Sequence, residues 1–508
     1  MEMRGPGMES ARRPRYQVTF GILTVGIGAF ALLQSLVIPV LSTIQVELHT
    51  SQDAVTWVLT AYLLSASVMT PILGRVGDIY GKKWVFVATL IALAVGSVLA
   101  AVAPNLAVMI VARAIQGLAG GMLPVGFGII RDEFPGDKVA GAVGVLAALL
   151  AVGGSLGIVL AGPIVNALNW HWLFWLPAIV TVIAAVGAVL FVPQSPIRSP
   201  GTISWLPAVL ISAWLVLLLV PLSEAPDWGW GSPAVIGMFV AAVLLAAAWV
   251  WSELRAATPL IDMKMMRVPA VWTNNLVALL IGVGLYAMFA FLPEFVQTPS
   301  TAGYGFGASI TRSGLMLLPS GVTMFAAGLF AGSLTRRLGG KVLVVAGCLI
   351  GCVSMAMFAF AHAHEWEIYV ATGILGVGFG LAFSAMSANV VSAVPPEQTG
   401  VATGMNANIR TIGGSIGAAA MASIVTAKLE PSGLPAGSGY TTGFGVMAAV
   451  LLVAALAGTL IPSQRRLRGA AGQGAAGEAA AVGTLAMAGD AVTGETAAGE
   501  TVASELGE

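Results

Sequence analysis

Two arginines lie inside long apolar stretches of the chain. Arg113 lies about eight residues, or roughly 12 Å of helix, from one end of its stretch, and Gln116 follows it at helical spacing. Arg410 lies about ten residues, or roughly 15 Å, inside another stretch and shares a helix face with Asn406. Each guanidinium should face a cavity or a partner, because a charge in apolar surroundings is costly.

The chemistry open to these arginines is binding. A buried cation could hold an anion or a carboxylate, or favour the charged form of a proton carrier. It could also cap backbone carbonyls or pair with an acid as part of the structure. Acids are scarce, since no Asp or Glu lies deep in an apolar stretch and the nearest candidates are Asp53 and Glu294. Glu294 could titrate near the mouth of a cavity or be an exposed loop carboxylate.

No pattern in the sequence indicates an enzyme. The chain has no GxxxxGK[ST] nucleotide loop, no HExxH zinc motif and no acid cluster suited to a metal. We therefore expect no cofactor and no metal site. The formal net charge is zero, from 23 basic and 23 acidic residues, so nothing suggests a nucleic acid partner.

The segments that must position the two arginines have the composition of membrane helices. Apolar residues make up 57% of the chain and charged residues 9%, with a mean hydropathy of +0.91. A soluble domain carries about 25% charged residues, whereas about 20 consecutive apolar residues cross a bilayer core. Fourteen stretches are candidate spans: 18–42, 54–73, 84–103, 105–130, 139–163, 172–192, 203–222, 233–251, 271–292, 311–334, 342–361, 368–389, 401–426 and 442–461.

The basic residues predict an orientation. An even number of spans places both termini on one side, where 19 of the 23 Lys and Arg then fall. Only Arg312 and Lys428 would lie on the other side. This asymmetry predicts a multi-pass cell-membrane protein with both termini in the cytoplasm. Residues 1–17 would be a cytoplasmic segment, and the Ala/Gly-rich residues 463–508 a disordered cytoplasmic tail.

An internal repeat divides the chain. The decapeptide GRVGDIYGKK at Gly74 has a weaker copy, GSLTRRLGGK, at Gly332. GGSLG, beginning at Gly153, recurs as GGSIG, beginning at Gly413. The repeat pairs the first six spans with the last six. It predicts a six-helix bundle at 18–192, two inserted linker helices at 203–251 and a second six-helix bundle at 271–461.

These features resemble the major facilitator superfamily. GRVGDIYGKK is similar to the family's signature loop between helices 2 and 3, and Arg113, Gln116 and Gly117 match its helix 4 motif. The layout of six, two and six spans resembles the family's fourteen-helix drug:proton antiporter branch. One departure is in the first helix, where Leu33 and Gln34 stand at the position at which that branch usually carries an acid.

The resemblance implies an all-α fold of two six-helix bundles plus two inserted helices, 14 transmembrane helices in all. It also implies that the signature loop latches the two halves together, through Gly74, Asp78, Gly81, Lys82 and Arg131. Lys82 could instead be a solvated loop residue that only follows the charge bias. The repeated glycines are expected to serve close helix packing: Gly153, Gly157, Gly413 and Gly417.

The implied function is a secondary transporter that exports hydrophobic or cationic drug-like compounds, with proton antiport and alternating access. We expect a monomer in the lipid bilayer with a small amphiphilic substrate. Export of an endogenous lipid-like or antibiotic metabolite, or a non-transporting sensor or scaffold, are the alternatives. Residues expected in transport and coupling are Arg113, Gln116, Glu294, Arg410 and Asn406. Aromatic and apolar candidates for the substrate cavity are Gln34, Trp57, Tyr62, Tyr286, Phe289 and Met386.

Overall fold

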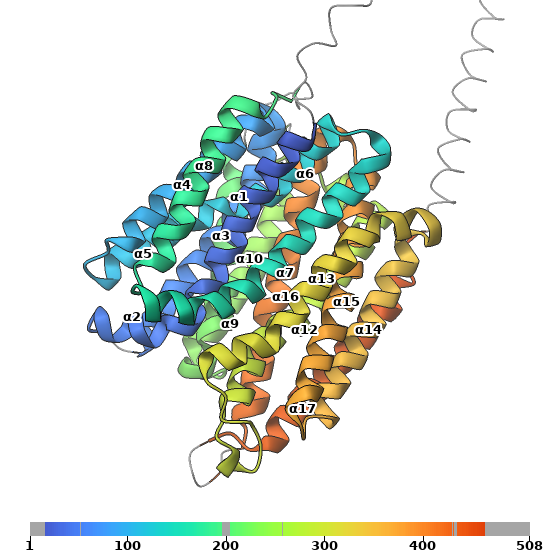
Figure 1. The fold of residues 1–508 in the computed structure, drawn as a ribbon. Coiled ribbons are helices and arrows are strands. Elements are labelled where there is room, and N and C mark those ends of the chain that lie inside the picture. The colour runs from blue at the N-terminus through green and yellow to red at the C-terminus, as the bar shows by residue number, and fades with distance from the viewer. Residues whose placement is uncertain are drawn as a thin grey trace, which may run out of the picture. The chain divides into compact units, whose positions relative to one another are not determined.

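A computed structural model describes residues 16–50, 52–195, 204–256, 258–428, 430 and 434–462 of the chain. The predicted tail 463–508 and the first fifteen residues of the predicted segment 1–17 therefore lie outside the described residues. The described residues from Tyr16 to Ile461 form one compact unit of helices (Figure 1). Its long helices alternate in direction, so every span begins at the end of the bundle where the preceding one stops.

The first half of the chain contains eight α-helices and two 3-10 turns among its described residues. They are α1 (Tyr16–Leu36), η1 (Ile38–Val40), α2 (Leu41–Glu47), α3 (Gln52–Tyr80), α4 (Lys82–Ala101), α5 (Leu106–Gly117), η2 (Leu118–Gly121), α6 (Met122–Glu133), α7 (Gly136–Ala167) and α8 (Trp172–Phe191). We call the end of the molecule at the α3–α4 turn the basic end and the opposite end the distal end.

The remaining helices follow the predicted order. Two long helices come first, α9 (Trp205–Trp228) and α10 (Pro233–Arg255), followed by the short α11 (Met263–Met266). The second half then comprises α12 (Pro269–Gln297), η3 (Ser300–Ala302), α13 (Ile310–Leu338), α14 (Gly340–Phe360), α15 (Glu365–Ala393), η4 (Pro396–Gln398), α16 (Thr399–Thr426) and α17 (Gly437–Gly458).

The helices confirm the all-α membrane fold. Within the described chain, 13 segments are long and apolar enough to cross a membrane. The remaining predicted span, 139–163, lies inside α7, a continuous helix of 32 residues. Apolar stretches of this length satisfy every backbone hydrogen bond internally, which is why they fold as helices in lipid.

One predicted span is not a regular helix. The stretch 105–130 is interrupted by the 3-10 turn η2, between α5 and α6. Glycines bring this turn against α3: a Cβ atom on Gly117 would lie 2.5 Å from the Ser65 Cβ, and one on Gly121 would lie 2.5 Å from the Leu73 Cβ. The predicted span is confirmed as the membrane segment Leu106–Glu133, but its helix is interrupted because the tertiary contact decides the local geometry.

Three hydrophobic cores hold the helices together. One is built almost entirely from α1 to α8 and a second from α12 to α17. A third joins α9 and α10 to residues of α12, α15 and α16. The predicted boundaries at 192, 203, 251 and 271 are compatible with these cores and stay a proposal.

Two seams join the halves. Along one seam, α7 packs against α13 over much of its length. Along the other, α3 packs against α16, and α9 lies against both of them. The inserted helix α9 thus covers one of the two seams, and this asymmetry shapes the cavities described below.

Candidate functional site

The signature loop packs the basic end tightly. A Cβ atom added to Gly74 of α3 would lie 2.6 Å from the carbonyl oxygen of Gly400 in α16. The Asp78 carboxylate, one turn further along α3, accepts a hydrogen bond from the Val401 amide at 3.2 Å. Val401 lies in the first turn of α16, where unpaired amides favour a negative charge. Asp78 therefore caps a helix of the other half.

Lys82 is part of this cluster. Its side chain is 1% exposed, and its Nζ lies 2.8 Å from the Asp132 carboxylate and 3.9 Å from that of Asp78. Ser195 also donates a hydrogen bond to Asp132. The turn before Lys82 is made by Gly81, whose φ of 109° is open to glycine at little cost. The alternative of a solvated Lys82 is thus wrong, because Asp132, which the sequence analysis did not single out, draws the ammonium inward.

Two arginines make further contacts across the halves at the basic end. Arg131, at the end of α6, donates to a backbone carbonyl of α15 and, at 2.7 Å, to the hydroxyl of Thr399 at the start of α16. Arg336, which takes the place of Asp78 in the second repeat, donates to the Asp137 carbonyl at 3.2 Å. Each half therefore contributes a side chain of its loop motif to the first turn of a helix in the other.

Arg113 lies within the first half and is fully buried. Its Nε donates to the Val58 carbonyl at 3.0 Å, and its Nη1 donates to Gln116 at 2.7 Å. Gln116 in turn donates to the Ser97 hydroxyl at 3.0 Å. The guanidinium also stacks 4.4 Å from the ring centre of Tyr62. Arg113 thus packs against the ring of Tyr62. Within the described chain, Nη2 is the one nitrogen of its guanidinium without a hydrogen-bond partner.

A central cavity of about 70 Å³ lies between the halves. Tyr62 and Gln34 line it from the first half, and Tyr286 and Arg410 from the second. All four are residues expected from the sequence, although no acid lies among the described residues of the lining. The other lining residues are Phe30, Leu63, Ala66, Ser67, Thr70, Gly120, Leu123, Ala407, Asn408 and Thr411.

Arg410 differs from Arg113 in having no polar partner. Its guanidinium lies 4.9 Å from the ring centre of Phe383, and it forms no hydrogen bond or ion pair with the part of the chain that the structure describes. Its expected neighbour Asn406 is engaged elsewhere and donates to Asn275 at 2.9 Å. Both Arg410 and Asn406 also line a small crevice next to the central cavity.

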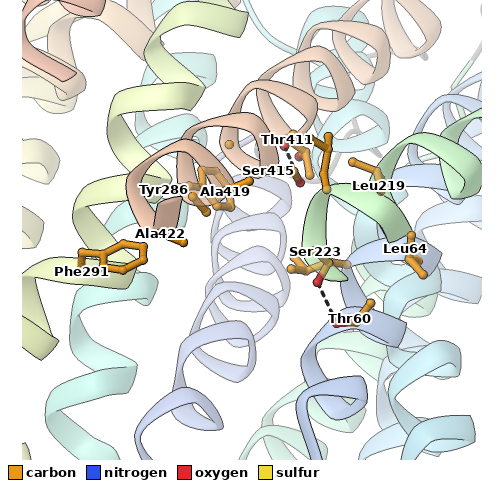
Figure 2. A pocket seen from close by; sticks show the side chains of 14 residues that line it. Thr60, Leu64, Leu219, Ser223, Tyr286, Phe291, Thr411, Ser415, Ala419 and Ala422 are labelled. Atoms are coloured by element: carbon orange, nitrogen blue, oxygen red, sulfur yellow. Dashed lines mark hydrogen bonds between the residues drawn. The ribbon is translucent and has the colours of Figure 1, made fainter. Parts of the chain in front are cut away.

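A lateral pocket of about 290 Å³ adjoins the central cavity toward the distal end. Its walls come from α3, α9, α12 and α16, and Figure 2 shows Leu219 and Ser223 of α9 across from Tyr286 and Ala419. A 3.5 Å contact between the hydroxyls of Thr60 and Ser223 ties α3 to α9. The remaining lining residues are Leu63, Leu64, Leu222, Phe291, Thr411, Gly414, Ser415, Ala418 and Ala422.

The two spaces share a wall. Leu63, Tyr286 and Thr411 line both the central cavity and the lateral pocket. The hydroxyls of Thr60 and Ser223 were not expected from the sequence, because nothing in a repeat shows where an inserted helix docks. The lateral pocket has a predominantly apolar lining, so the pair combines a polar compartment with an apolar one.

Other expected residues lie away from these spaces. Trp57, Phe289 and Met386 are not among the residues that line the three cavities above, and Met386 is fully buried in the core of the second half. Glu294 lies near the distal end of α12, beside Tyr440.

The repeated glycines lie at helix contacts. A Cβ atom on Gly153 would lie 2.3 Å from the Cβ of Ala31 in α1, and one on Gly157 would lie 2.8 Å from a carbonyl oxygen of the same helix. In the second half, a Cβ on Gly413 or Gly417 would lie 2.0 or 2.1 Å from a carbonyl oxygen of α12.

Four acids near span ends are more buried than the sequence indicated. Besides Asp78 and Asp132, Glu224 of α9 is 8% exposed and Glu253 of α10 is 3% exposed. Glu253 accepts hydrogen bonds from Trp249 and from the Ile261 amide, which fixes the loop after α10. None of the four lines the central cavity or the lateral pocket.

Known proteins resemble the chain over most of its length. The multidrug resistance protein B homolog of Mycobacterium tuberculosis is 28% identical over 401 residues, which are 77% of this chain and 72% of that protein. The tetracenomycin C resistance and export protein of Streptomyces glaucescens is 27% identical over 424 residues, 83% of this chain and 78% of that protein.

The fold has a solved counterpart and a family model. The crystal structure of the human organic anion transporter MFSD10 (TETRAN) superposes with a TM-score of 0.65 over 88% of this chain and 100% of that one. At 15% identity, this likeness concerns the fold. The model of the Major Facilitator Superfamily matches residues 23–418 and, in a second match, 277–493. The chain therefore belongs to the major facilitator superfamily of membrane transporters.

Proposed function

We propose that this protein is a secondary transporter that exports amphiphilic drug-like molecules across the cell membrane by alternating access. The observation that carries the proposal is the pair of joined spaces between the halves, one polar and one apolar. A molecule that occupies both would contact α1, α3, α12 and α16 together. Relative movement of the halves would then change the binding site and its access at once. The two relatives named for drug resistance or export support this substrate class.

The orientation follows from the charge bias. With the basic end in the cytoplasm, as the positive-inside rule favours, the contacts of Asp78, Lys82 and Arg131 close the cytoplasmic side. The lateral pocket then lies toward the outer leaflet. In this assignment the structure corresponds to the state from which a substrate leaves the cell, and the latch must open before the next substrate enters.

Proton antiport is the proposed source of energy. Export against a gradient requires coupling, and no ATP-binding loop is present in the sequence. No carboxylate lies among the described lining residues of the three cavities, so the proton carrier would act from outside them. Glu294 at the distal end of α12 is our candidate.

An efflux assay tests this function. Cells that produce the protein are loaded with the neutral amphiphile Nile red, and loss of fluorescence is followed with and without an uncoupler. We expect faster efflux than in cells that produce the Asp78→Asn variant, and the uncoupler should remove the difference if protons are coupled. Equal efflux from both cell types, for Nile red and for acidic and basic dyes of similar size, would contradict the proposal.

A second candidate substrate is an endogenous aromatic metabolite. The relative from Streptomyces glaucescens is named for resistance to, and export of, tetracenomycin C. Deletion of this gene in its own host, followed by comparison of metabolites inside and outside the cells, would test this alternative.

A further inference from the structure

The cavities between the halves carry a positive charge and no described acid. We propose that the protein takes an amphiphilic anion, whose acidic head binds Arg410 in the central cavity while its apolar body occupies the lateral pocket. This inference rests on the proposed function, since it names the substrate class of the same site. It replaces the cationic compounds expected from the sequence with anionic ones.

The Arg410 guanidinium has no polar partner within the described chain. Its side chain is partly exposed to the cavity, and its guanidinium has the Phe383 ring as its neighbour but no hydrogen bond or ion pair within the described chain. Arg113 shows how this protein treats a structural arginine, because two of that residue's nitrogens donate to protein oxygens. Five N–H donors in a planar fork suit a carboxylate, which can accept two of them. Arg410 therefore presents an unused anion-binding group.

Polar atoms without a hydrogen-bond partner in the described chain also surround the central cavity. Tyr62, Ser67 and Asn408 line it and are 1%, 3% and 1% exposed, respectively. The hydroxyls of Tyr62 and Ser67, and both polar atoms of the Asn408 amide, have no hydrogen-bond partner among the described residues. Buried polar groups are rarely left unpaired, so these atoms need a ligand or water. Each of the three side chains can donate, and donors suit a ligand rich in acceptors.

The charge of the cavity lining favours an anionic ligand. Arg410 is the one charged side chain among the described residues that line the central cavity, its adjoining crevice and the lateral pocket. In a space of low polarity, an uncompensated guanidinium repels a cation and attracts an anion more strongly than it would in water. A cationic substrate would need a carboxylate here, and the nearest candidate of the sequence, Glu294, does not line these spaces.

The volumes of the two spaces suit an elongated ligand. The central cavity, at about 70 Å³, has room for an acidic head but not for a drug-sized body. The lateral pocket, at about 290 Å³, adds apolar space beyond the shared wall of Leu63, Tyr286 and Thr411. In the proposed pose, an elongated ligand passes the side chains that both spaces share, with its head beside Arg410 and its apolar part against α9, which makes the inserted helix a wall of the binding site.

Three probes with one apolar body test the proposal. Pyrenebutyrate, pyrenebutanol and pyrenebutyltrimethylammonium share the pyrene and differ in the charge of the head. Binding is measured by equilibrium dialysis against the protein in nanodiscs, with empty nanodiscs subtracted. We expect the anion to bind about tenfold to 100-fold more tightly than the alcohol, the range for a hydrogen bond to a charged group. The cation should bind most weakly.

Substitutions then locate the effect. Arg410→Gln should remove the advantage of the anion and leave the alcohol unchanged, whereas Arg410→Lys should keep part of it. The control is Arg337→Gln, the same change at an exposed arginine of α13 with no partner within the described chain. If Arg410→Gln fails to fold, the relative affinities of the unmodified protein for the three probes still test the proposal. A preference for the cation, or an anion preference that survives Arg410→Gln, would overturn the proposal.

Failure of this inference can be told apart from failure of the proposed function. A protein that exports Nile red but prefers the cationic probe is an exporter with a different substrate class. A protein that binds pyrenebutyrate through Arg410 but moves no compound in the efflux assay has the anion site without the transport.

Discussion

At the scale of single residues, the two arginines inside membrane spans have the same chemistry and different surroundings. Arg113 is enclosed by the Val58 carbonyl, Gln116 and the Tyr62 ring, whereas Arg410 faces the cavity without a polar partner in the part of the chain that the structure describes. The sequence placed both arginines inside membrane spans. It could not separate them, because two of the groups around Arg113, the Val58 carbonyl and the Tyr62 ring, come from α3 and lie up to 55 positions away in the sequence.

The two arginines should respond differently to truncation. Arg113→Ala leaves the buried Oε1 of Gln116 without its donor, which costs about 1–3 kcal/mol, and removes the side-chain bond to the Val58 carbonyl. We expect lower thermal stability and less folded protein for Arg113→Ala, measured by fluorescence-detected size exclusion after heating. Arg410→Ala should fold like the unmodified protein and lose transport of anionic amphiphiles. Equal loss of stability in both variants would show that Arg410 is also a structural residue.

The carboxylate of Asp78 is expected to stabilise the state in which the cytoplasmic side is closed. Asp78→Asn keeps an acceptor for the Val401 amide but removes the negative charge next to Lys82 and the first turn of α16. We expect most transport to be lost while expression stays near normal, as measured by efflux and by immunoblot of membranes. The matched control is Asp137→Asn, because Asp137 is exposed and contributes its backbone carbonyl to the contact. Full activity of Asp78→Asn would remove the gating role.

At the scale of elements, the membrane helices could be predicted because long apolar runs have one solution in lipid. The 3-10 turn η2 could not, since the approach of α3 to Gly117 and Gly121 is a tertiary contact. The role of α9 could not be predicted from the sequence either. Its sequence shows an apolar helix, whereas its contact with α3 and α16, and hence the wall of the lateral pocket, depends on where the inserted pair docks.

Filling the lateral pocket should narrow the range of substrates. Ala422 of α16 lines that pocket near the distal end (Figure 2), so Ala422→Trp puts an indole into the space proposed for the apolar body. We expect transport of bulky amphiphiles to fall several-fold, with a smaller effect on compact ones, as measured in everted vesicles. Ala247→Trp, on an exposed face of α10, is the control for added bulk. Unchanged transport of pyrene-sized compounds by Ala422→Trp would exclude the pocket from the substrate path.

At the scale of the whole molecule, the orientation in the membrane is open to direct test. Ser438 lies exposed at the distal end and Ser333 exposed near the basic end. In a variant without Cys348 and Cys352, Ser438→Cys should react with an impermeant maleimide added to intact cells, and Ser333→Cys should react only after the membrane is opened. The reverse pattern would place the basic end outside the cell.

The net charge of the substrate should also appear in the energetics of the whole transport cycle. An anion that leaves a cell with a negative interior moves down the membrane potential, which contributes about 2.3 kcal/mol per charge for each 100 mV, or about a 50-fold gradient. A coupled proton would add a second charge, whereas exchange of a cation for one proton would move none. In everted vesicles, we therefore expect a potassium diffusion potential, positive inside, to drive pyrenebutyrate uptake without a pH gradient. Arg337→Gln should behave like the unmodified protein. Uptake that follows the pH gradient and ignores the potential would contradict an anionic substrate, because no cycle that carries an anion one way and returns a proton is electroneutral.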